Sequence, residues 1–151
     1  MLQQKISDSL KEFLKAGKSF EAGVLRMLLS VVHNKEIEKR GKGLEPALSE
    51  EEITEVLAKE AKKRKEAVEI YSKAGRDNLA EKEAEELKIV KFYLPPELNR
   101  EEIEKAVERA VKKTGASGPK DIGKAMGEAM KELKGRAEAG TVSEIVRKKL
   151  E

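Results

Sequence analysis

The sequence contains no cysteine and no tryptophan, only one histidine, and aromatic residues at 3% of its positions. Without a thiol the chain can form neither a disulfide nor a thiolate site, and we expect a reducing, cytoplasmic location. The single histidine, His33, argues against a histidine-based metal site or catalytic triad, and we interpret it as a surface residue. The scarcity of aromatic side chains argues against nucleic-acid recognition by base stacking.

Long apolar runs and the sequence signatures of catalysis are missing as well. No stretch of about 18 apolar residues occurs, so we expect no membrane-spanning helix and no membrane partner. The sequence has no phosphate-binding loop, dinucleotide fingerprint, nucleophile elbow or zinc-ligand spacing. We therefore predict no catalytic residue, no cofactor and no metal ion.

Apolar residues recur every three to four positions, which is typical of amphipathic helices, and no segment shows the alternation of a strand. We therefore predict an all-α fold with about seven helices: an N-terminal multi-helical subdomain followed by a small C-terminal three-helix bundle. The expected helices are 2–16, from 19 to the glycines at 41 and 43, 49–74, 77–93, from 99 to the turn at 114–119, 119–135 and 141–150.

The clearest boundary is Pro95-Pro96, because proline lacks the backbone donor and bars the preceding residue from helical geometry. We expect subdomains at 1–94 and 99–151, joined by a linker at 95–98. Capping boxes, in which two side chains satisfy each other's free backbone N–H groups, are predicted at three helix starts. Their residue pairs are Ser49 with Glu52, Asn99 with Glu102, and Thr141 with Glu144. Asp77 is expected to cap the fourth helix.

The positive charge is concentrated at the C-terminal end. Residues 1–98 carry 19 Lys/Arg and 19 Asp/Glu, whereas residues 99–151 carry 13 and 10, which accounts for the whole net charge of +3. A basic end on a neutral body indicates local contact with an anion rather than general adhesion to nucleic acid.

The sixth predicted helix separates its residue types by face. Ile122, Met126, Met130 and Leu133 form one apolar stripe, and Asp121, Glu128 and Glu132 form an acidic flank. A basic face contains Lys120, Lys124, Gly127, Lys131 and Lys134. Two interpretations are open: a solvated face that keeps the helix exposed, or a face that docks a polyanion whose backbone approaches the glycine. Gly123, near the apolar stripe, is expected to serve helix packing, and Arg147 continues the basic character.

Glu60 and Arg64 also allow two interpretations. They lie one turn apart on the apolar line of the third helix, which predicts an ion pair at the edge of the core. The alternative is an arginine that binds an anion while the glutamate holds it. We favour the ion pair.

Several motifs occur together in one order along the chain. They are Leu25-Arg-Met-Leu-Leu-Ser30, Lys59-Glu-Ala-Lys-Lys-Arg-Lys-Glu66, Lys73-Ala-Gly-Arg76, Tyr93-Leu-Pro95, Gly123-Lys-Ala-Met-Gly127 and Lys134-Gly-Arg-Ala137. In these motifs the sequence resembles the YqeY-like proteins over almost its whole length. The C-terminal half is similar to the tail of the B subunit of glutamine-dependent aspartyl/glutamyl-tRNA amidotransferases.

The resemblance implies an all-helical fold, a link to carbon–nitrogen ligase chemistry with glutamine as the amide donor, and tRNA as a partner. The residues that match the tail motif become candidate tRNA contacts: Lys124, Gly127, Lys131, Lys134, Gly135 and Arg136. The cradle domain, metal ligands and nucleotide site that the amidotransferase needs are absent from the sequence.

Three functions are consistent with these observations. The first is a non-catalytic helical module that binds structured RNA, most directly tRNA, through phosphates and 2′-hydroxyls. The second is an adaptor that docks on an amidotransferase or an aminoacyl-tRNA synthetase. The third is an accessory subunit that stimulates an amidotransferase.

Overall fold

The computed structural model describes residues 1–151 and contains seven α-helices, one short 3-10 helix and no strand. The prediction of an all-α fold with about seven helices is confirmed. Contacts within the chain divide it into two compact units, Met1–Leu94 and Pro95–Glu151.

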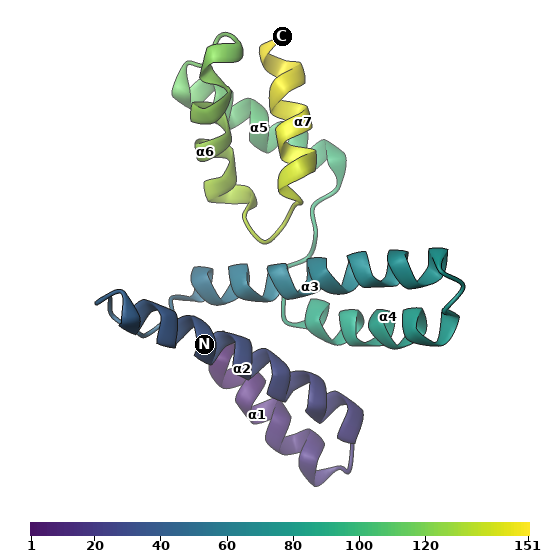
Figure 1. Ribbon diagram of the computed structural model, residues 1–151. Coiled ribbons are helices and arrows are strands. Elements are labelled where there is room, and N and C mark those ends of the chain that lie inside the picture. Colours follow the sequence, from purple (N-terminus) through teal and green to yellow (C-terminus); the bar gives the residue numbers. More distant parts are fainter. The chain divides into compact units, whose positions relative to one another are not determined.

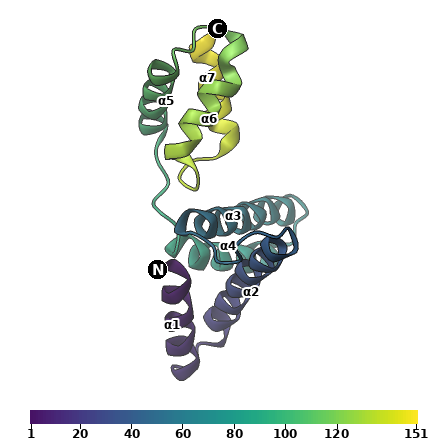
Figure 2. The ribbon, with the colours of Figure 1, turned by 90° about the vertical axis from the view of Figure 1, so that its left-hand side faces the viewer.

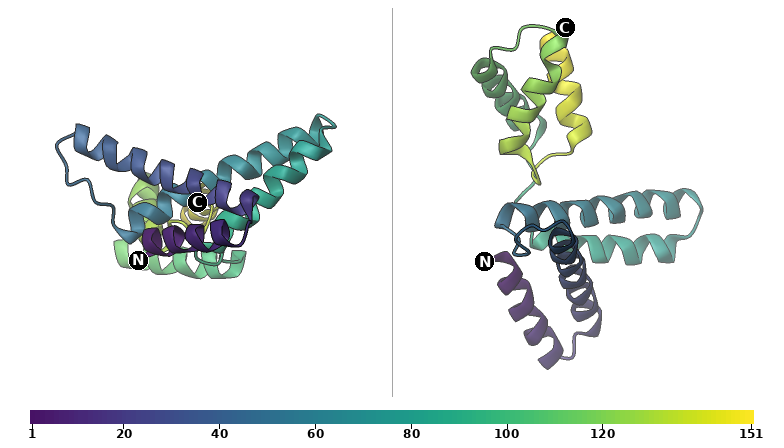
Figure 3. Two further views of the ribbon diagram at one scale, coloured as in Figure 1. Left: turned by 90° about the horizontal axis from the view of Figure 1, so that it is seen from below. Right: turned by 60° about the vertical axis from the view of Figure 1, so that its left-hand side comes forward.

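The first unit consists of two helical hairpins (Figures 1 and 3). In one hairpin α1 packs beside α2, and in the other α3 packs beside α4. The four helices are α1 (Leu2–Lys15), α2 (Ser19–Gly41), α3 (Glu50–Lys73) and α4 (Asp77–Phe92). Gly17 and Gly75 close the two tight turns with φ of +71° and +69°, a left-handed backbone that residues with a Cβ rarely adopt.

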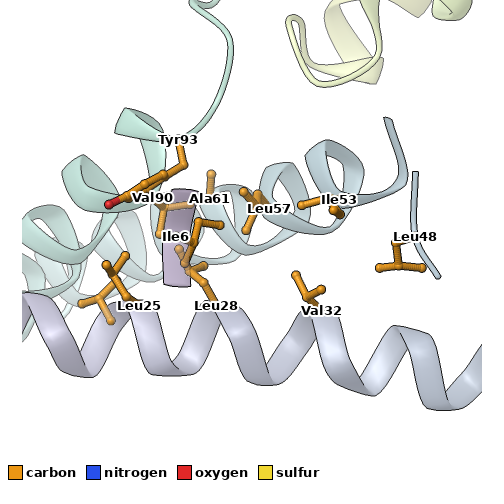
Figure 4. Packing of buried hydrophobic residues seen from close by; sticks show 11 residues of the cluster. Ile6, Leu25, Leu28, Val32, Leu48, Ile53, Leu57, Ala61, Val90 and Tyr93 are labelled. Carbon is orange, nitrogen blue, oxygen red and sulfur yellow. The ribbon is translucent and has the colours of Figure 1, made fainter. Parts of the chain in front are cut away.

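The core of the first unit lies where α2 faces α3 and α4. Figure 4 shows Leu25, Leu28 and Val32 on α2 opposite the apolar side chains of α3. The buried cluster comprises Ile6, Val24, Leu25, Leu28, Val32, Leu48, Ile53, Leu57, Ala61, Val90 and Tyr93. α2 contributes more of these residues than any other helix and is the central helix of this unit.

A charged network lies at the edge of this core. Glu60 is the one buried charged residue of the chain, at 7% exposure. Arg64 Nη1 donates to Glu60 Oε2 at 2.9 Å, and Arg64 Nε lies 3.3 Å from Glu86 Oε2 on α4. Burial raises the pKa of Glu60, but the hydrogen bonds from Lys63 and Arg64 outweigh this and leave the pKa below its ordinary value. The interpretation of Glu60 and Arg64 as an ion pair is confirmed. The Arg64 guanidinium is held by carboxylates of the protein itself.

The prediction for the start of α4 is wrong. Asp77 does not cap the helix but is its first residue, and the cap position is occupied by Arg76. The turn at Gly75 is so short that the N–H of Arg76 still bonds to the carbonyl of Tyr71 at the end of α3. Leu79 is 39% exposed, and the neighbouring Ala80 faces inward instead.

The second unit is a three-helix bundle of α5, α6 and α7 (Figure 2). Its helices are α5 (Arg100–Thr114), η1 (Pro119–Asp121), α6 (Ile122–Leu133) and α7 (Ala139–Leu150). The buried cluster comprises Ile103, Ala106, Val107, Ala110, Ala125, Ala129, Leu133, Val142, Ile145, Val146 and Leu150. The Leu98 N–H donates to the Arg136 carbonyl at 2.9 Å, which ties the segment before α5 to the turn after α6.

Two of the three predicted capping boxes are confirmed. Ser49 with Glu52 and Asn99 with Glu102 each make both reciprocal hydrogen bonds. The box at Thr141 is wrong, because α7 already begins at Ala139 and Thr141 lies inside its first turn. The carboxylate of Glu144 instead pairs with Arg100 and Lys148, both at 3.1 Å.

Asn99 caps a helix whereas Thr141 does not, so the two residues give a matched test of helix capping. Asn99→Ala should destabilise the protein by about 1 kcal/mol, because the Glu102 N–H at 2.9 Å loses its acceptor. Thr141→Ala should change stability by less than about 0.5 kcal/mol, because no capping bond is lost. Urea denaturation followed by circular dichroism measures both. A larger loss from Thr141→Ala than from Asn99→Ala would contradict the observed start of α7.

Candidate nucleic-acid interface

The buried face of α6 is centred on its small residues. Ala125, Ala129 and Leu133 are at most 1% exposed, whereas Ile122, Met126 and Met130 are only partly buried. Of the predicted apolar stripe, Leu133 lies at the centre of the core, whereas Ile122, Met126 and Met130 lie at its rim. Alanines at the centre allow the neighbouring helices of the bundle to pack closely against α6.

The acidic flank of α6 faces α5. Glu128 Oε1 lies 2.7 Å from Lys113 Nζ on α5, and its Oε2 lies 2.8 Å from Lys131 Nζ. One turn later, Glu132 lies 2.6 Å from Arg109 on α5. The hydrogen bonds from Lys113 and Lys131 lower the pKa of Glu128 to about 2. The Glu128 carboxylate is thus ionised at neutral pH, and both Glu128 and Glu132 are bound to neighbouring cations.

The contacts between α5 and α7 are also bordered by ion pairs. Lys149 on α7 lies 2.8 Å from Glu108 on α5. Glu144 on α7 joins Arg100 and Lys148. At both the α5–α6 and the α5–α7 interfaces, carboxylates therefore neutralise nearby cations.

Three predicted contact residues remain unpaired. Lys120, Lys124 and Arg147 are exposed, and no carboxylate oxygen lies within 4.0 Å of their side-chain nitrogens. α7 contacts η1 as well as α6, and its C-terminal end lies beside η1 (Figures 1 and 2). Arg147, near the end of α7, therefore lies at the same end of the bundle as Lys120 and Lys124. We call Lys120, Lys124 and Arg147 the free cations.

The other candidate contact residues have different surroundings. Lys131 is 72% exposed but paired with Glu128, and Lys134 is exposed and has an interaction partner within the chain. Gly135 forms the turn after α6 with φ of +77°. Arg136 is half-buried in that turn, and its Nε is buried without a hydrogen-bond partner.

Lys120 does not lie on the α-helix that the sequence predicted. It belongs to η1, because the Asp121 N–H bonds to the Gly118 carbonyl at 2.9 Å and forms a separate 3-10 turn. The Asp121 carboxylate also accepts from the Ser117 N–H at 3.1 Å, which holds this turn. Lys120 is thus placed at the N-terminal end of α6 rather than along it.

The two glycines of α6 face open space. Gly123 and Gly127 are exposed, and a Cβ built on either would meet no atom within 4 Å. The expectation that Gly123 serves helix packing is therefore wrong. Glycine inside a helix costs about 0.5–1 kcal/mol relative to alanine, and no contact within the chain offsets this cost. Both glycines leave the α6 backbone accessible beside Lys124 and Lys131.

A family model described as Yqey-like protein matches residues 3–150, nearly the whole chain. This chain belongs to the YqeY-like family. The resemblance found in the sequence motifs is confirmed at the level of the family.

Among curated proteins, the YqeY-like chain is 35% identical over 94 residues to an uncharacterized protein of Schizosaccharomyces pombe. The aligned region covers 62% of this chain and 72% of that protein. It is 32% identical over 104 residues to altered inheritance of mitochondria protein 41, mitochondrial, of Kluyveromyces lactis, and 30% identical over 116 residues to the protein of that name in Lachancea thermotolerans. These two matches cover 68% and 76% of this chain but only 54% and 60% of the relatives.

The cytoplasmic location predicted from the sequence is wrong by this comparison, since the relatives of K. lactis and L. thermotolerans are named as mitochondrial proteins. The prediction failed because a lack of cysteine excludes disulfides without distinguishing one compartment from another. None of the helices of the YqeY-like chain has the length and apolar character needed to cross a membrane. No three acidic or histidine side chains gather as a metal site would require.

Proposed function

We propose that this YqeY-like protein is a non-catalytic module that binds structured RNA, most directly tRNA, through the outer face of α6 and the end of α7. The free cations carry this proposal. The bundle neutralises most of its other basic side chains with its own carboxylates, whereas Lys120, Lys124 and Arg147 have none. A phosphate can bind them without first breaking an ion pair within the protein.

The exposed glycines support close approach of an RNA backbone. Gly127 lies one turn from both Lys124 and Lys131 and has no packing role within the chain. Its missing side chain lets a ribose or phosphate come near the helix while the lysines on either side contact neighbouring phosphates. Such contacts recognise the shape and the 2′-hydroxyls of RNA and carry no information on base sequence. The resemblance to the amidotransferase tail supports tRNA as the RNA, and it is the only link to carbon–nitrogen ligase chemistry.

Filter binding of tRNA to the intact protein at several salt concentrations tests the proposal. A plot of the logarithm of affinity against the logarithm of salt concentration should have a negative slope of about 0.7–0.9 per phosphate contact. The three free cations together should contribute a slope of about 2–3. Duplex DNA of equal charge should bind more weakly, because it lacks the A-form shape and the 2′-hydroxyl. Failure to bind tRNA at low salt would refute the proposal, and equal affinity for the DNA would refute recognition of RNA shape.

An adaptor role is the second candidate. The observation that favours it is two exposed apolar side chains near the tip of the α3–α4 hairpin, Ile70 at 64% and Leu79 at 39% exposure. The partner would be an amidotransferase, which the protein would serve as an accessory subunit, or an aminoacyl-tRNA synthetase. Capture of such an enzyme from a nuclease-treated lysate, lost on Ile70→Glu, would support this role. Capture that disappears with nuclease treatment would instead support RNA binding.

A further inference from the structure

Glu128 occupies an unusual position at the border between the acidic flank of α6 and the proposed RNA face. Its side chain is 15% exposed, while those of its two partners, Lys113 and Lys131, are each 72% exposed. Each carboxylate oxygen holds a different lysine, at 2.7 Å on α5 and at 2.8 Å on α6. The carboxylate is therefore fixed between α5 and α6, whereas both ammonium groups remain accessible to a ligand from solvent.

Lys131 belongs to the proposed RNA face by its place on α6. It follows Gly127 by one turn and Lys124 by two turns, so the three residues lie along one side of the helix. Unlike Lys124, it shares its charge with a carboxylate. A phosphate that approaches Lys131 must compete with Glu128 at 2.8 Å and is also repelled by the carboxylate that remains.

On the basis of the proposed RNA binding, we propose that Glu128 acts as a built-in brake on the affinity of this face for RNA. It does so by holding Lys131 in an ion pair and by placing a negative charge beside the phosphate path. The brake is permanent at physiological pH, because that pH lies far above the Glu128 pKa of about 2. Its strength sets how many phosphate contacts an RNA must offer before it binds.

Glu132 supplies a matched control on the same flank. It lies one turn after Glu128, carries the same charge, and bonds to Arg109 of α5 at 2.6 Å. None of the lysines on the RNA face is its partner. Neutralising Glu132 therefore changes the net charge by the same amount without releasing a cation of that face.

The test compares Glu128→Gln with Glu132→Gln in the full-length chain, using filter binding of tRNA at several salt concentrations. Glu128→Gln should tighten binding on the order of tenfold near 0.1 M salt and steepen the salt dependence by about one counterion, because Lys131 becomes available. Glu132→Gln should tighten binding less than about threefold, because it releases Arg109 rather than a lysine of the RNA face and salt screens the lost charge. Equal gains from both variants, or no gain from Glu128→Gln, would overturn the brake while leaving RNA binding by the unaltered protein intact.

A second pair of variants applies even if Glu128→Gln does not fold. Lys124→Gln and Lys131→Gln each remove one exposed lysine, and neither disturbs the core. If the Glu128 carboxylate already offsets the positive charge of Lys131, then Lys131→Gln should weaken tRNA binding clearly less than Lys124→Gln does. An equal or larger loss from Lys131→Gln would overturn the proposal. If the unaltered protein bound no tRNA at low salt, the proposed function itself would fail.

Discussion

Replacing Lys120, Lys124 and Arg147 together with alanine is expected to weaken tRNA binding about a thousandfold near 0.1 M salt. Each phosphate contact on a duplex releases about 0.9 of a counterion. At this salt concentration, the loss of one such contact lowers the affinity on the order of tenfold. The salt dependence should become shallower by about 2–3 counterions. The fold should be retained, because all three side chains are exposed and take part in no hydrogen bond or ion pair. Filter binding measures the affinity, and circular dichroism checks the helix content.

A triple variant with the same change in charge serves as the control. Lys105, Lys148 and Lys149 are also exposed, but each is paired with a glutamate on α5 or α7. Their replacement by alanine should weaken tRNA binding less than about tenfold, because only the overall charge changes. Equal losses from the two triple variants would show that net charge, rather than the free cations, determines binding.

The second large effect concerns stability. Arg64→Ala should destabilise the first unit by about 3 kcal/mol, the lower end of the range for breaking a buried ion pair, because Glu60 keeps Lys63 as a partner. The side chains of Arg64 and Glu60 are 11% and 10% exposed, so the carboxylate that remains is poorly hydrated. The contact between Arg64 Nη2 and Met27 Sδ at 3.4 Å is also lost, which loosens α2 against α3. Urea denaturation gives the change in free energy of unfolding.

Lys63→Ala provides the comparison, because Lys63 bonds to the same Glu60 at 2.8 Å but is itself 71% exposed. Its loss should cost less than about 1 kcal/mol, as is usual for an ion pair at the surface. Similar costs for the two variants would mean that burial of Arg64 contributes little. RNA binding should be unaffected by Lys63→Ala, which separates the stability of the first unit from the function of the second.

The sequence predicted those parts of the fold that depend on neighbours along the chain. Apolar residues at three- and four-residue spacing located the helices, and the pairs Ser49–Glu52 and Asn99–Glu102 located two helix starts, because both bonds of a capping box are local. The same pattern at Thr141 failed, because Glu144 bonds to Arg100 on another helix, and a contact so distant in sequence has no local signal.

The pairing of lysines with carboxylates of another helix was beyond prediction for the same reason. Helical spacing placed Lys124 and Lys131 on one face, but the pairing of Glu128 with Lys113 joins two helices and depends on how α5 packs against α6. Gly123 appeared suited to packing because small residues often face a neighbouring helix, yet no neighbour lies within 4 Å of a Cβ built there. The spacing of Glu60 and Arg64 was informative, because their pair lies within one helix.

The central claim is that structured RNA binds the outer face of the second unit. Backbone amide NMR spectra of the intact protein, recorded with increasing tRNA at low salt, test it most directly. The proposal predicts that the signals of Lys120, Lys124, Gly127 and Arg147 shift or broaden first, while those of α1 to α4 stay unchanged. Early changes confined to the first unit, or no change at any residue, would contradict it.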